Sequence, residues 1–340
     1  MTPEIEFLTD HIPEPTEVYE ITPGIQWVRM PLPFRLNHIN LWLLEDESGW
    51  TMVDTGINDD RTKEIWKSIL GSVLNGKPLA KLVCTHAHPD HIGLGGWIHD
   101  EYGAELVITR EEWTFGRLVS MGGYKTKKNH EDYFLKIGCD EADLPSFGDH
   151  IMSADELYCD VPLHYERMRD GSKIEMGGKS WEVIIGLGHS LEHACLYCEE
   201  LNVMIAGDQV LPKITPTIMV HSNEPEANPL EDFLISNEKL RHLPEDVTIL
   251  PSHNRPFKGI HRRLDEYISH HEERLEVVLE SCDQPRSGIE VSKILFPQDL
   301  DFHGKYFASG EAMAHIRYLE VKGKLSRSLG TDGVERYQRA

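Results

Sequence analysis

The sequence predicts an α/β fold built from layered sheets, with a smaller helical domain at the C-terminal end. Short apolar strand patterns alternate with helical spacings over the first third of the chain, and strand patterns return between residues 173 and 250. This alternation is typical of domains in which helices cover the faces of sheets. After residue 260 the spacing is mainly helical, which favours a separate domain of winged-helix type.

Individual elements follow from the spacing of apolar residues. Ile65, Trp66, Ile69 and Val73 recur at helical spacing, whereas short apolar runs bounded by turn residues are typical of strands. The predicted strands are residues 25–28, 39–44, 50–53, 79–85, 105–108, 173–185, 194–198, 203–206, 247–250 and 334–337. The predicted helices are residues 61–74, 91–102, 111–121, 129–137, 261–279, 289–295 and 312–322.

Two helical patterns between residues 110 and 160 interrupt the alternation of strands and helices. We interpret this stretch as a helical insertion that could serve as a lid over a cleft. The predicted domains are therefore 1–260, which contains the insertion 110–160, and a C-terminal helical domain over 261–340.

The charge balance excludes some partners. The chain has 34 Lys and Arg residues against 57 Asp and Glu residues, a formal net charge of -23. Such a balance repels phosphate backbones and anionic membrane surfaces, so neither nucleic acid nor a membrane is an expected partner. A basic stripe near the C-terminal end, formed by Arg317, Lys322, Lys324 and Arg327, is interpreted as a solvated helix face.

The predicted location is the cytoplasm. Residues 1–10 are acidic and hold no apolar signal-peptide region, and no apolar run approaches the roughly 20 residues needed to cross a bilayer. The cysteines are too sparse for a disulfide scaffold. Cys195 and Cys198 are interpreted as buried residues of a strand, because no second pair completes a four-thiolate zinc site.

The residues that carry chemistry lie directly after the predicted strand 79–85. His86, His88, Asp90 and His91 offer the imidazole and carboxylate ligands that suit zinc and similar divalent ions. Their spacing lets His86 and His88 turn to one ion, while Asp90 and His91 can face a second one. Strand ends are also where ligands tend to bind in α/β sheets.

Together with later motifs, this run resembles the metallo-β-lactamase-fold hydrolase superfamily, in the branch similar to glyoxalase II and the lactonases. The motifs, in family order within residues 19–260, are Val53-Asp54-Thr55-Gly56, His86-Ala87-His88-Pro89-Asp90-His91, Gly188-His189-Ser190, Gly207-Asp208 and Ser252-His253. The resemblance implies a four-layer αββα sandwich, in which 1–260 is the catalytic domain, and an appended helical domain.

The resemblance also implies a set of metal ligands. One ion would bind His86, His88 and His189, the other would bind Asp90, His91 and His253, and Asp208 would bridge both. Asp54 would orient the ligand loop without binding metal itself. The two divalent ions per chain, zinc first with iron or manganese as alternatives, would share a hydroxide that attacks the substrate. Asp90 would orient this nucleophile and carry a proton to the leaving group.

Substrate contacts leave a weaker pattern. His189 follows glycine, as the family's ligand does, so His193 is left to line the pocket, to hydrogen-bond nearby or to serve the structure alone. Glu192 stands where many relatives have glycine, a departure that bears on the local geometry. His221, in a segment rich in Pro, Thr and Asn, is a candidate for substrate contact.

The function expected from these residues is hydrolysis of a small carbonyl substrate, a thioester or a lactone. A phosphodiesterase or RNA-cleaving nuclease is the alternative, and the acidity of the chain argues against it. A persulfide dioxygenase with one iron is a further alternative, since it retains a similar histidine set. A non-catalytic regulator is disfavoured by the intact set of ligand positions. The expected partners are a small-molecule substrate and a second copy of the chain in a homodimer.

Overall fold

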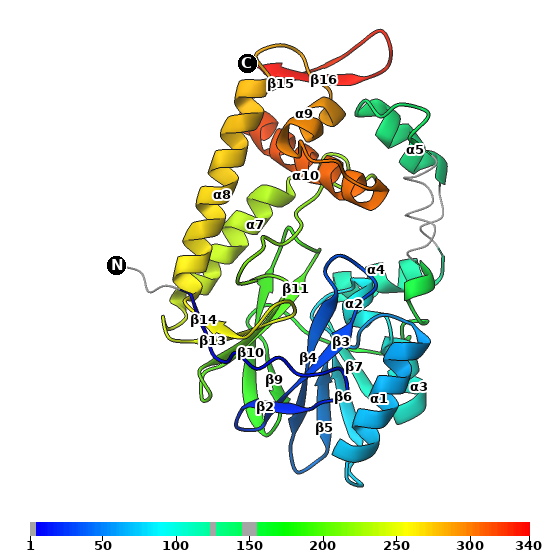
Figure 1. Cartoon of the computed structure of the whole chain (residues 1–340), viewed down its shortest axis with the longest axis vertical. Coiled ribbons are helices and arrows are strands. Elements are labelled where there is room, and N and C mark those ends of the chain that lie inside the picture. Colours follow the sequence, from blue (N-terminus) through cyan, green and yellow to red (C-terminus); the bar gives the residue numbers. More distant parts are fainter. Residues whose placement is uncertain (1–4, 123–126, 145–154) are drawn as a thin grey trace. The chain divides into compact units, whose positions relative to one another are not determined.

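The structure, a computed structural model, describes residues 5–122, 127–144 and 155–340. The chain forms two compact units, and each unit combines segments from distant parts of the sequence (Figure 1). The first unit comprises Met1–Gly123, Ala154–Pro216 and Lys239–Arg263, and the second comprises Tyr124–Ser153, Thr217–Glu238 and Leu264–Ala340. Among the described helices, none combines the length and the apolar character that a membrane span requires.

The first unit contains two mixed sheets. In spatial order the first sheet consists of β2 (Tyr19–Thr22), β3 (Ile25–Pro31), β4 (His38–Glu45), β5 (Trp50–Val53), β6 (Leu79–Val83), β7 (Glu105–Ile108) and β8 (Glu166–Arg167). The second consists of β1 (Glu6–Phe7), β14 (Phe257–Lys258), β13 (Thr248–Pro251), β12 (Val203–Gly207), β11 (His193–Cys198), β10 (Lys179–Gly186) and β9 (Lys173–Met176). The pairs β5·β6 and β12·β13 are parallel, so their carboxyl ends meet at one edge of each sheet.

The inner faces of the two sheets share one apolar core. Trp27 and Trp42 of the first sheet and Trp181 of the second belong to it, each at most 1% exposed. The rings of Trp27 and Trp42 are stacked, with centroids 6.2 Å apart. Burying a large apolar side chain stabilises a fold by about 2 kcal/mol, so this core holds the two sheets, and the loops at their ends, in register.

Helices of the first unit are α1 (Asp60–Val73), α2 (Pro89–Ile92), α3 (Gly95–Tyr102) and α4 (Arg110–Ser120), with short 3-10 turns η1 (Asp155–Leu157) and η2 (Lys239–His242). The side chain of Asp59 caps α1 by accepting the Thr62 N–H, and the apolar face of α1 is buried. From this face the indole N–H of Trp66 donates to the Thr55 carbonyl at 2.7 Å. The helix therefore anchors the loop that follows β5.

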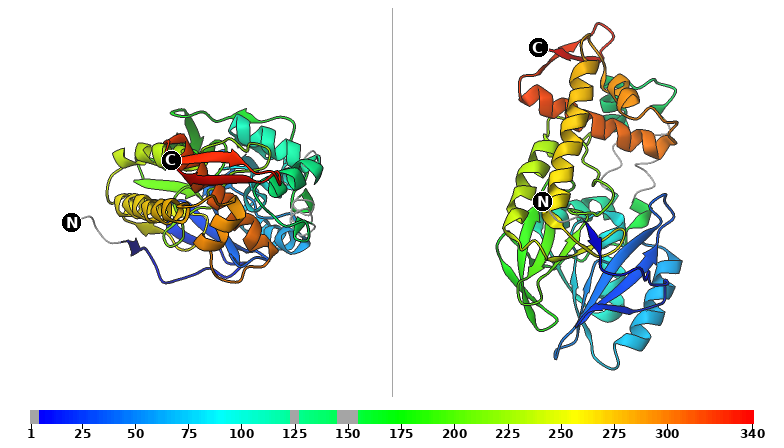
Figure 2. Two further views of the ribbon diagram at one scale, coloured as in Figure 1. Left: turned by 90° about the horizontal axis from the view of Figure 1, so that it is seen from above. Right: turned by 60° about the vertical axis from the view of Figure 1, so that its left-hand side comes forward.

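The second unit contains α5 (Lys127–Lys136), α7 (Pro229–Glu238), most of α8 (Ile260–Ser281), α9 (Gly288–Leu295), α10 (Phe302–Val321) and the hairpin of β15 (Leu325–Leu329) and β16 (Glu335–Arg339). Figure 2 shows this hairpin in red near the C-terminal end. Arg327 of β15 donates to both carboxylate oxygens of Glu226, at 2.7 and 2.8 Å, which ties the hairpin to the segment before α7. The winged-helix type of the C-terminal domain stays a prediction.

The predicted α/β class, with two sheets and a C-terminal helical region, is confirmed. The predicted helix 91–102 is in fact two helices, α2 and α3, with Gly93 between them. A Cβ on Gly93 would lie 2.2 Å from the Pro89 carbonyl oxygen and 2.6 Å from that of Leu157, so the chain turns where another segment comes close. The predicted strand 173–185 is the hairpin of β9 and β10, because Gly177 and Gly178 adopt φ of 59° and 67°.

Other elements have no clear sequence pattern. The apolar spacing does not indicate α7 or β15, and α10 begins at Phe302 instead of Ala312 because small residues weaken its apolar stripe. Of the predicted insertion 110–160, α4 belongs to the first unit and α5 to the second, while 123–126 and 145–154 lie outside the described residues. The insertion's role as a lid and the domain boundary at residue 260 stay predictions.

Candidate metal centre

The seven predicted ligands all lie in the first unit, in the segments that follow its strands. The loop after β6 carries His86 and His88, and the short helix α2 next to it carries Asp90 and His91. His189 lies in the β10–β11 turn, Asp208 directly after β12 and His253 shortly after β13. The parallel pairs β5·β6 and β12·β13 thus bring these loops to the same end of the two sheets.

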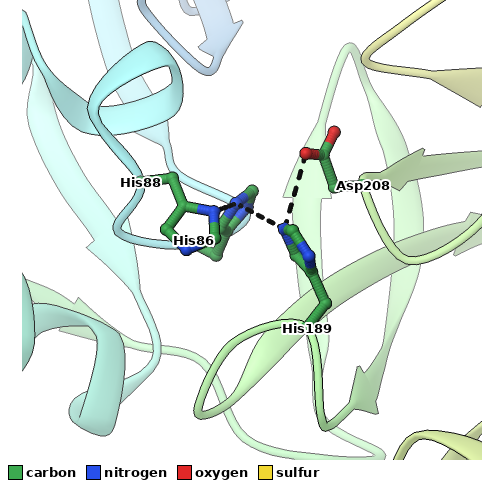
Figure 3. A group of neighbouring side chains, drawn as sticks. All are labelled: His86, His88, His189 and Asp208. Carbon is green, nitrogen blue, oxygen red and sulfur yellow. Dashed lines mark hydrogen bonds and ion pairs between the residues drawn. The ribbon is translucent and has the colours of Figure 1, made fainter. Parts of the chain in front are cut away.

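One group of donor atoms comes from His86, His88, His189 and Asp208, and these atoms all lie within 4.8 Å of one another. Figure 3 shows the three imidazoles and the carboxylate turned toward a common centre. His86 Nε2 lies 2.8 Å from His88 Nδ1 and 3.3 Å from His189 Nε2. The second carboxylate oxygen of Asp208, Oδ2, is 3.4 Å from His189 Nε2.

A second group consists of Asp90, His91 and His253, whose donor atoms also lie within 4.8 Å of one another. His253 Nε2 is 3.6 Å from Asp90 Oδ2, and His91 Nε2 is 3.8 Å from Asp90 Oδ1. The other oxygen of Asp208, Oδ1, is 3.3 Å from His253 Nε2 and 3.7 Å from His91 Nε2. The two oxygens of Asp208 therefore face two different groups of donors.

The donors at this centre fit a divalent cation. His91 Nε2 and Asp208 Oδ1 are buried and have no hydrogen-bond partner in the described structure, although buried polar atoms are normally satisfied. Burial and the neighbouring imidazoles lower the pKa of His86 well below its ordinary value, which favours the neutral form that binds metal. Burial opposes ionisation of Asp208, but His253 and His91 outweigh it, and the pKa of Asp208 is well below its usual range.

Asp54 makes hydrogen bonds to the ligand loop and to the residue that precedes it. Its Oδ2 accepts a hydrogen bond from His91 Nδ1 at 2.8 Å, and its Oδ1 accepts the Thr85 N–H at 2.8 Å. Since Nδ1 donates in the first contact, Nε2 is the nitrogen of His91 that is directed at the centre. Asp54 adopts φ 61°, a left-handed conformation that is uncommon outside glycine and that lets its carboxylate turn back under the loop.

His253 is held in the same way by a different partner. Its Nδ1 donates to the His38 carbonyl at 2.8 Å, so its Nε2 faces the carboxylates. His38 Nε2 in turn accepts the Asn254 N–H at 2.9 Å. Burial, with smaller effects of Arg29 and His253, lowers the pKa of His38 to about 3, so this acceptor nitrogen stays unprotonated at neutral pH.

His193 supports the backbone at Asp208. It is fully buried, and its Nε2 accepts the Asp208 N–H at 3.0 Å. Of the roles left open for His193, the structure favours hydrogen bonding over contact with substrate, because no part of the side chain is exposed. Gly207 makes this contact possible: a Cβ there would lie 2.4 Å from His193 Nε2. His221 belongs to the second unit, and its contact with substrate stays a prediction.

Glu112, on α4, is a residue of the site for which the sequence gives no motif. It is 1% exposed, and its two carboxylate oxygens accept hydrogen bonds from the N–H of Ala87 at 2.8 Å and of Glu192 at 2.7 Å. Ala87 lies between His86 and His88. Glu112 therefore ties the loop after β6, on the first sheet, to the β10–β11 loop of the second sheet.

The unusual Glu192 has a local role in the same contact. Its carboxylate accepts the Glu111 N–H at 3.2 Å at the start of α4, and its carbonyl accepts the Thr109 hydroxyl at 2.9 Å. A carboxylate at this position compensates for the free N–H groups of the first turn of α4. Where many relatives have a glycine, the side chain of Glu192 therefore attaches the loop to α4.

Comparisons with known proteins agree with this arrangement. Residues 35–253 match the family described as "Metallo-beta-lactamase superfamily", and residues 275–340 match the "Metallo-beta-lactamase-like, C-terminal domain". The chain is 23% identical to "Probable metallo-hydrolase YqjP" of Bacillus subtilis over 87% of this chain and 92% of that one.

Two solved structures resemble the whole chain. A beta-lactamase domain protein from Burkholderia ambifaria is 38% identical, with a TM-score of 0.92, over 99% of this chain and 98% of the other. A metallo-beta-lactamase family protein from Thermus thermophilus is 28% identical, with a TM-score of 0.79, over 94% of this chain and 100% of the other. The chain therefore belongs to the metallo-β-lactamase superfamily.

Proposed function

We propose that the protein is a hydrolase that uses two divalent metal ions. The observation that carries this proposal is the position of Asp208, whose two oxygens face separate groups of donor atoms. His86, His88 and His189 would hold one ion, Asp90, His91 and His253 would hold the other, and Asp208 would contact both. We propose zinc first, with iron or manganese as alternatives, because imidazole and carboxylate suit all three.

Two such ions supply an activated water at neutral pH and polarise the bond to be cleaved. The chain's own residues do the rest. Asp90 is the member of the second group that solvent reaches, with 17% of its side chain exposed, whereas His91 is fully buried. Asp90 can therefore accept a proton from water and return it to a leaving group. Asp54 and the His38 carbonyl hold His91 and His253 in the required tautomers.

We propose a small carbonyl substrate, a thioester or a lactone. The net charge of -23 disfavours polyanions such as RNA. Leu191, which lies between His189 and His193 in the sequence, is 46% exposed, and Phe34, in the loop before β4, is 43% exposed. An exposed apolar side chain such as Leu191, in the loop that carries His189, suits an acyl group better than a sugar–phosphate chain.

The first test is metal content by elemental analysis of the purified protein, with two ions per chain expected. Fewer than one ion per folded chain would contradict the proposal. A panel of acyl-CoA, acyl-glutathione, lactone, β-lactam and bis-nitrophenyl phosphate then separates the substrate classes. Cleavage confined to the phosphodiester would point to a phosphodiesterase or nuclease, and iron with oxygen uptake on a persulfide would point to a dioxygenase.

We also propose a cytoplasmic location and a homodimer. All six cysteines are free, as expected in a reducing compartment. Light scattering of the eluted protein during size-exclusion chromatography measures the mass directly, and a single species at the mass of one chain would contradict the dimer.

A further inference from the structure

A cavity of about 350 Å³ lies in the first unit and is lined by none of the seven proposed metal ligands. This volume is at the lower end of the range found for small-molecule sites. Three cationic side chains line it in a chain with a large excess of acidic residues. Its charged lining residues are Arg167, Arg169, Asp170, Glu192 and Lys239, and we call this space the arginine cavity.

Arg167 is placed by β8, and Arg169 lies two residues further along the chain, beyond the end of this strand. Arg167 ends β8, where it is paired with Ile108, and the Met168 N–H continues the pairing by donating to the Ile108 carbonyl at 3.0 Å. Met168, between the two arginines, is 1% exposed and belongs to the core shared by the two sheets. The side chains of both arginines line the cavity.

The charges around the cavity leave the two arginines without an ionic partner. Lys239 is paired with Asp170 at 2.8 Å, and the Glu192 carboxylate accepts the Glu111 N–H. Across the residues that the structure describes, no carboxylate pairs with Arg167 or Arg169. Two guanidinium groups against the single carboxylate of Glu192 leave the cavity with an excess of positive charge.

One donor of Arg167 lacks an acceptor within the described structure. The Nε of Arg167 is buried and, within the described structure, has no hydrogen-bond partner. A buried N–H of a charged group that lacks an acceptor is costly, and such atoms in proteins are normally satisfied by a protein group, water or a bound ion. The planar guanidinium matches two oxygens of a carboxylate or phosphate at once.

We propose that the arginine cavity binds the oxyanion group of a small ligand, a phosphate or a carboxylate, at Arg167 and Arg169. The apolar side chains of Ile185 and Leu187 form part of the lining, so the remainder of the ligand can be apolar or mixed. This site does not depend on the proposed hydrolysis, because binding is measured without turnover.

The test is calorimetric titration of the purified protein, in phosphate-free buffer at low ionic strength, with inorganic phosphate in one arm and succinate in the other. The arm that saturates identifies the type of oxyanion. Arg167→Gln and Arg169→Gln should each weaken that binding about 10-fold or more, since each removes charged hydrogen bonds. Arg61→Gln, at an exposed arginine of α1, is the matched control and should bind as the wild type does.

Three outcomes overturn the proposal. The first is that neither anion saturates the wild type. The second is that both variants, at Arg167 and Arg169, bind with wild-type affinity while they unfold at the wild-type temperature. The third is binding that chelation of metal abolishes and that neither arginine variant weakens, because the anion then sits on the metal centre. Arg169 is exposed, so its variant remains informative if Arg167→Gln fails to fold.

Discussion

Buried histidines cluster in both units, and the two clusters differ in their surroundings. In the second unit His271 of α8 and His315 of α10 meet with Nδ1 and Nε2 3.2 Å apart. Burial is the main reason that the pKa of His271 is lowered to about 2 and that of His315 to about 4. Within the described part of the chain neither histidine donates a hydrogen bond to a carboxylate, and the Nδ1 of His315 donates to the Glu311 carbonyl.

At the candidate metal centre the same residue type is mixed with carboxylates. Among the described residues, groups of three or more donor side chains close enough to share an ion occur at this centre and nowhere else. Asp208 and Asp90 lie within 4 Å of the histidine nitrogens and supply negative charge. Burial alone makes a histidine neutral, whereas histidine and carboxylate together make a site for a cation.

The largest expected effect comes from Asp208→Asn. An amide has one oxygen and no charge, so it cannot contact both donor groups as the carboxylate does. We expect kcat/KM for the substrate identified in the panel to fall at least about 1000-fold, because metal ions contribute several kcal/mol to such reactions. Metal content by elemental analysis should fall in the same variant. His271→Leu, in the histidine cluster of the second unit, should keep kcat/KM within about 3-fold of the wild-type value. Equal losses in both variants would contradict the proposed difference between the two clusters.

Glu112→Gln tests whether the metal centre depends on the contact between its loops. The amide can accept only one of the two N–H groups that the carboxylate accepts, from Ala87 and Glu192. Loss of a contact that supports ligands typically costs 10- to 100-fold in metal affinity or activity, and we expect a loss of about that size. Metal affinity by competition with a chelator and kcat measure it.

Glu111→Gln is the matched control for this variant, since Glu111 precedes Glu112 on α4 and 45% of its side chain is exposed. It should behave as the wild type. If Glu112→Gln matches Glu111→Gln in both measurements, the contact between the loops is not needed by the site.

The smallest effect is expected in the histidine cluster of the second unit, from pH. Because the pKa of His271 is lowered on folding, the unfolded chain takes up a proton below about pH 6.5 that the folded chain does not. The free energy of unfolding should therefore decrease as the pH is lowered. His271→Leu should remove roughly 2 kcal/mol of this decrease between pH 6.5 and 4.5. Urea unfolding of both proteins at the two pH values measures the difference.

Glu311 acts in the opposite direction in this range, because burial raises its pKa to about 7. It is present in both proteins, so it cancels in the comparison of wild type and variant. A pH dependence that is the same in both proteins would show that His271 takes up no extra proton on unfolding.

Much of the fold and the positions of the proposed ligands follow from the sequence. The loop after β6 directly follows an apolar strand, and its His-x-His-x-Asp-His spacing is local. The closeness of these four side chains therefore follows from the sequence pattern. His189, Asp208 and His253 follow strands that the apolar pattern also indicates. The position of Asp54 under the loop agrees with the role expected from its motif.

Glu112 and the arginine cavity could not be predicted in this way. Glu112 hydrogen-bonds to Ala87 and Glu192, which lie 25 and 80 positions away in the sequence. From its sequence pattern alone, a buried glutamate on an amphipathic helix cannot be distinguished from a solvent-exposed one. Arg167 lies on a two-residue strand, too short to give an alternating pattern. Contacts of this kind depend on how distant segments meet, and neither spacing nor composition records that.

The contact between His193 and Gly207 limits how this site can evolve or be redesigned. Any side chain at 207 would overlap the imidazole, and any smaller residue at 193 would leave the Asp208 N–H without its acceptor. Neither position can therefore change alone without disturbing the residue that faces both donor groups. Among related sequences, we expect the two positions either to change together or to stay the same.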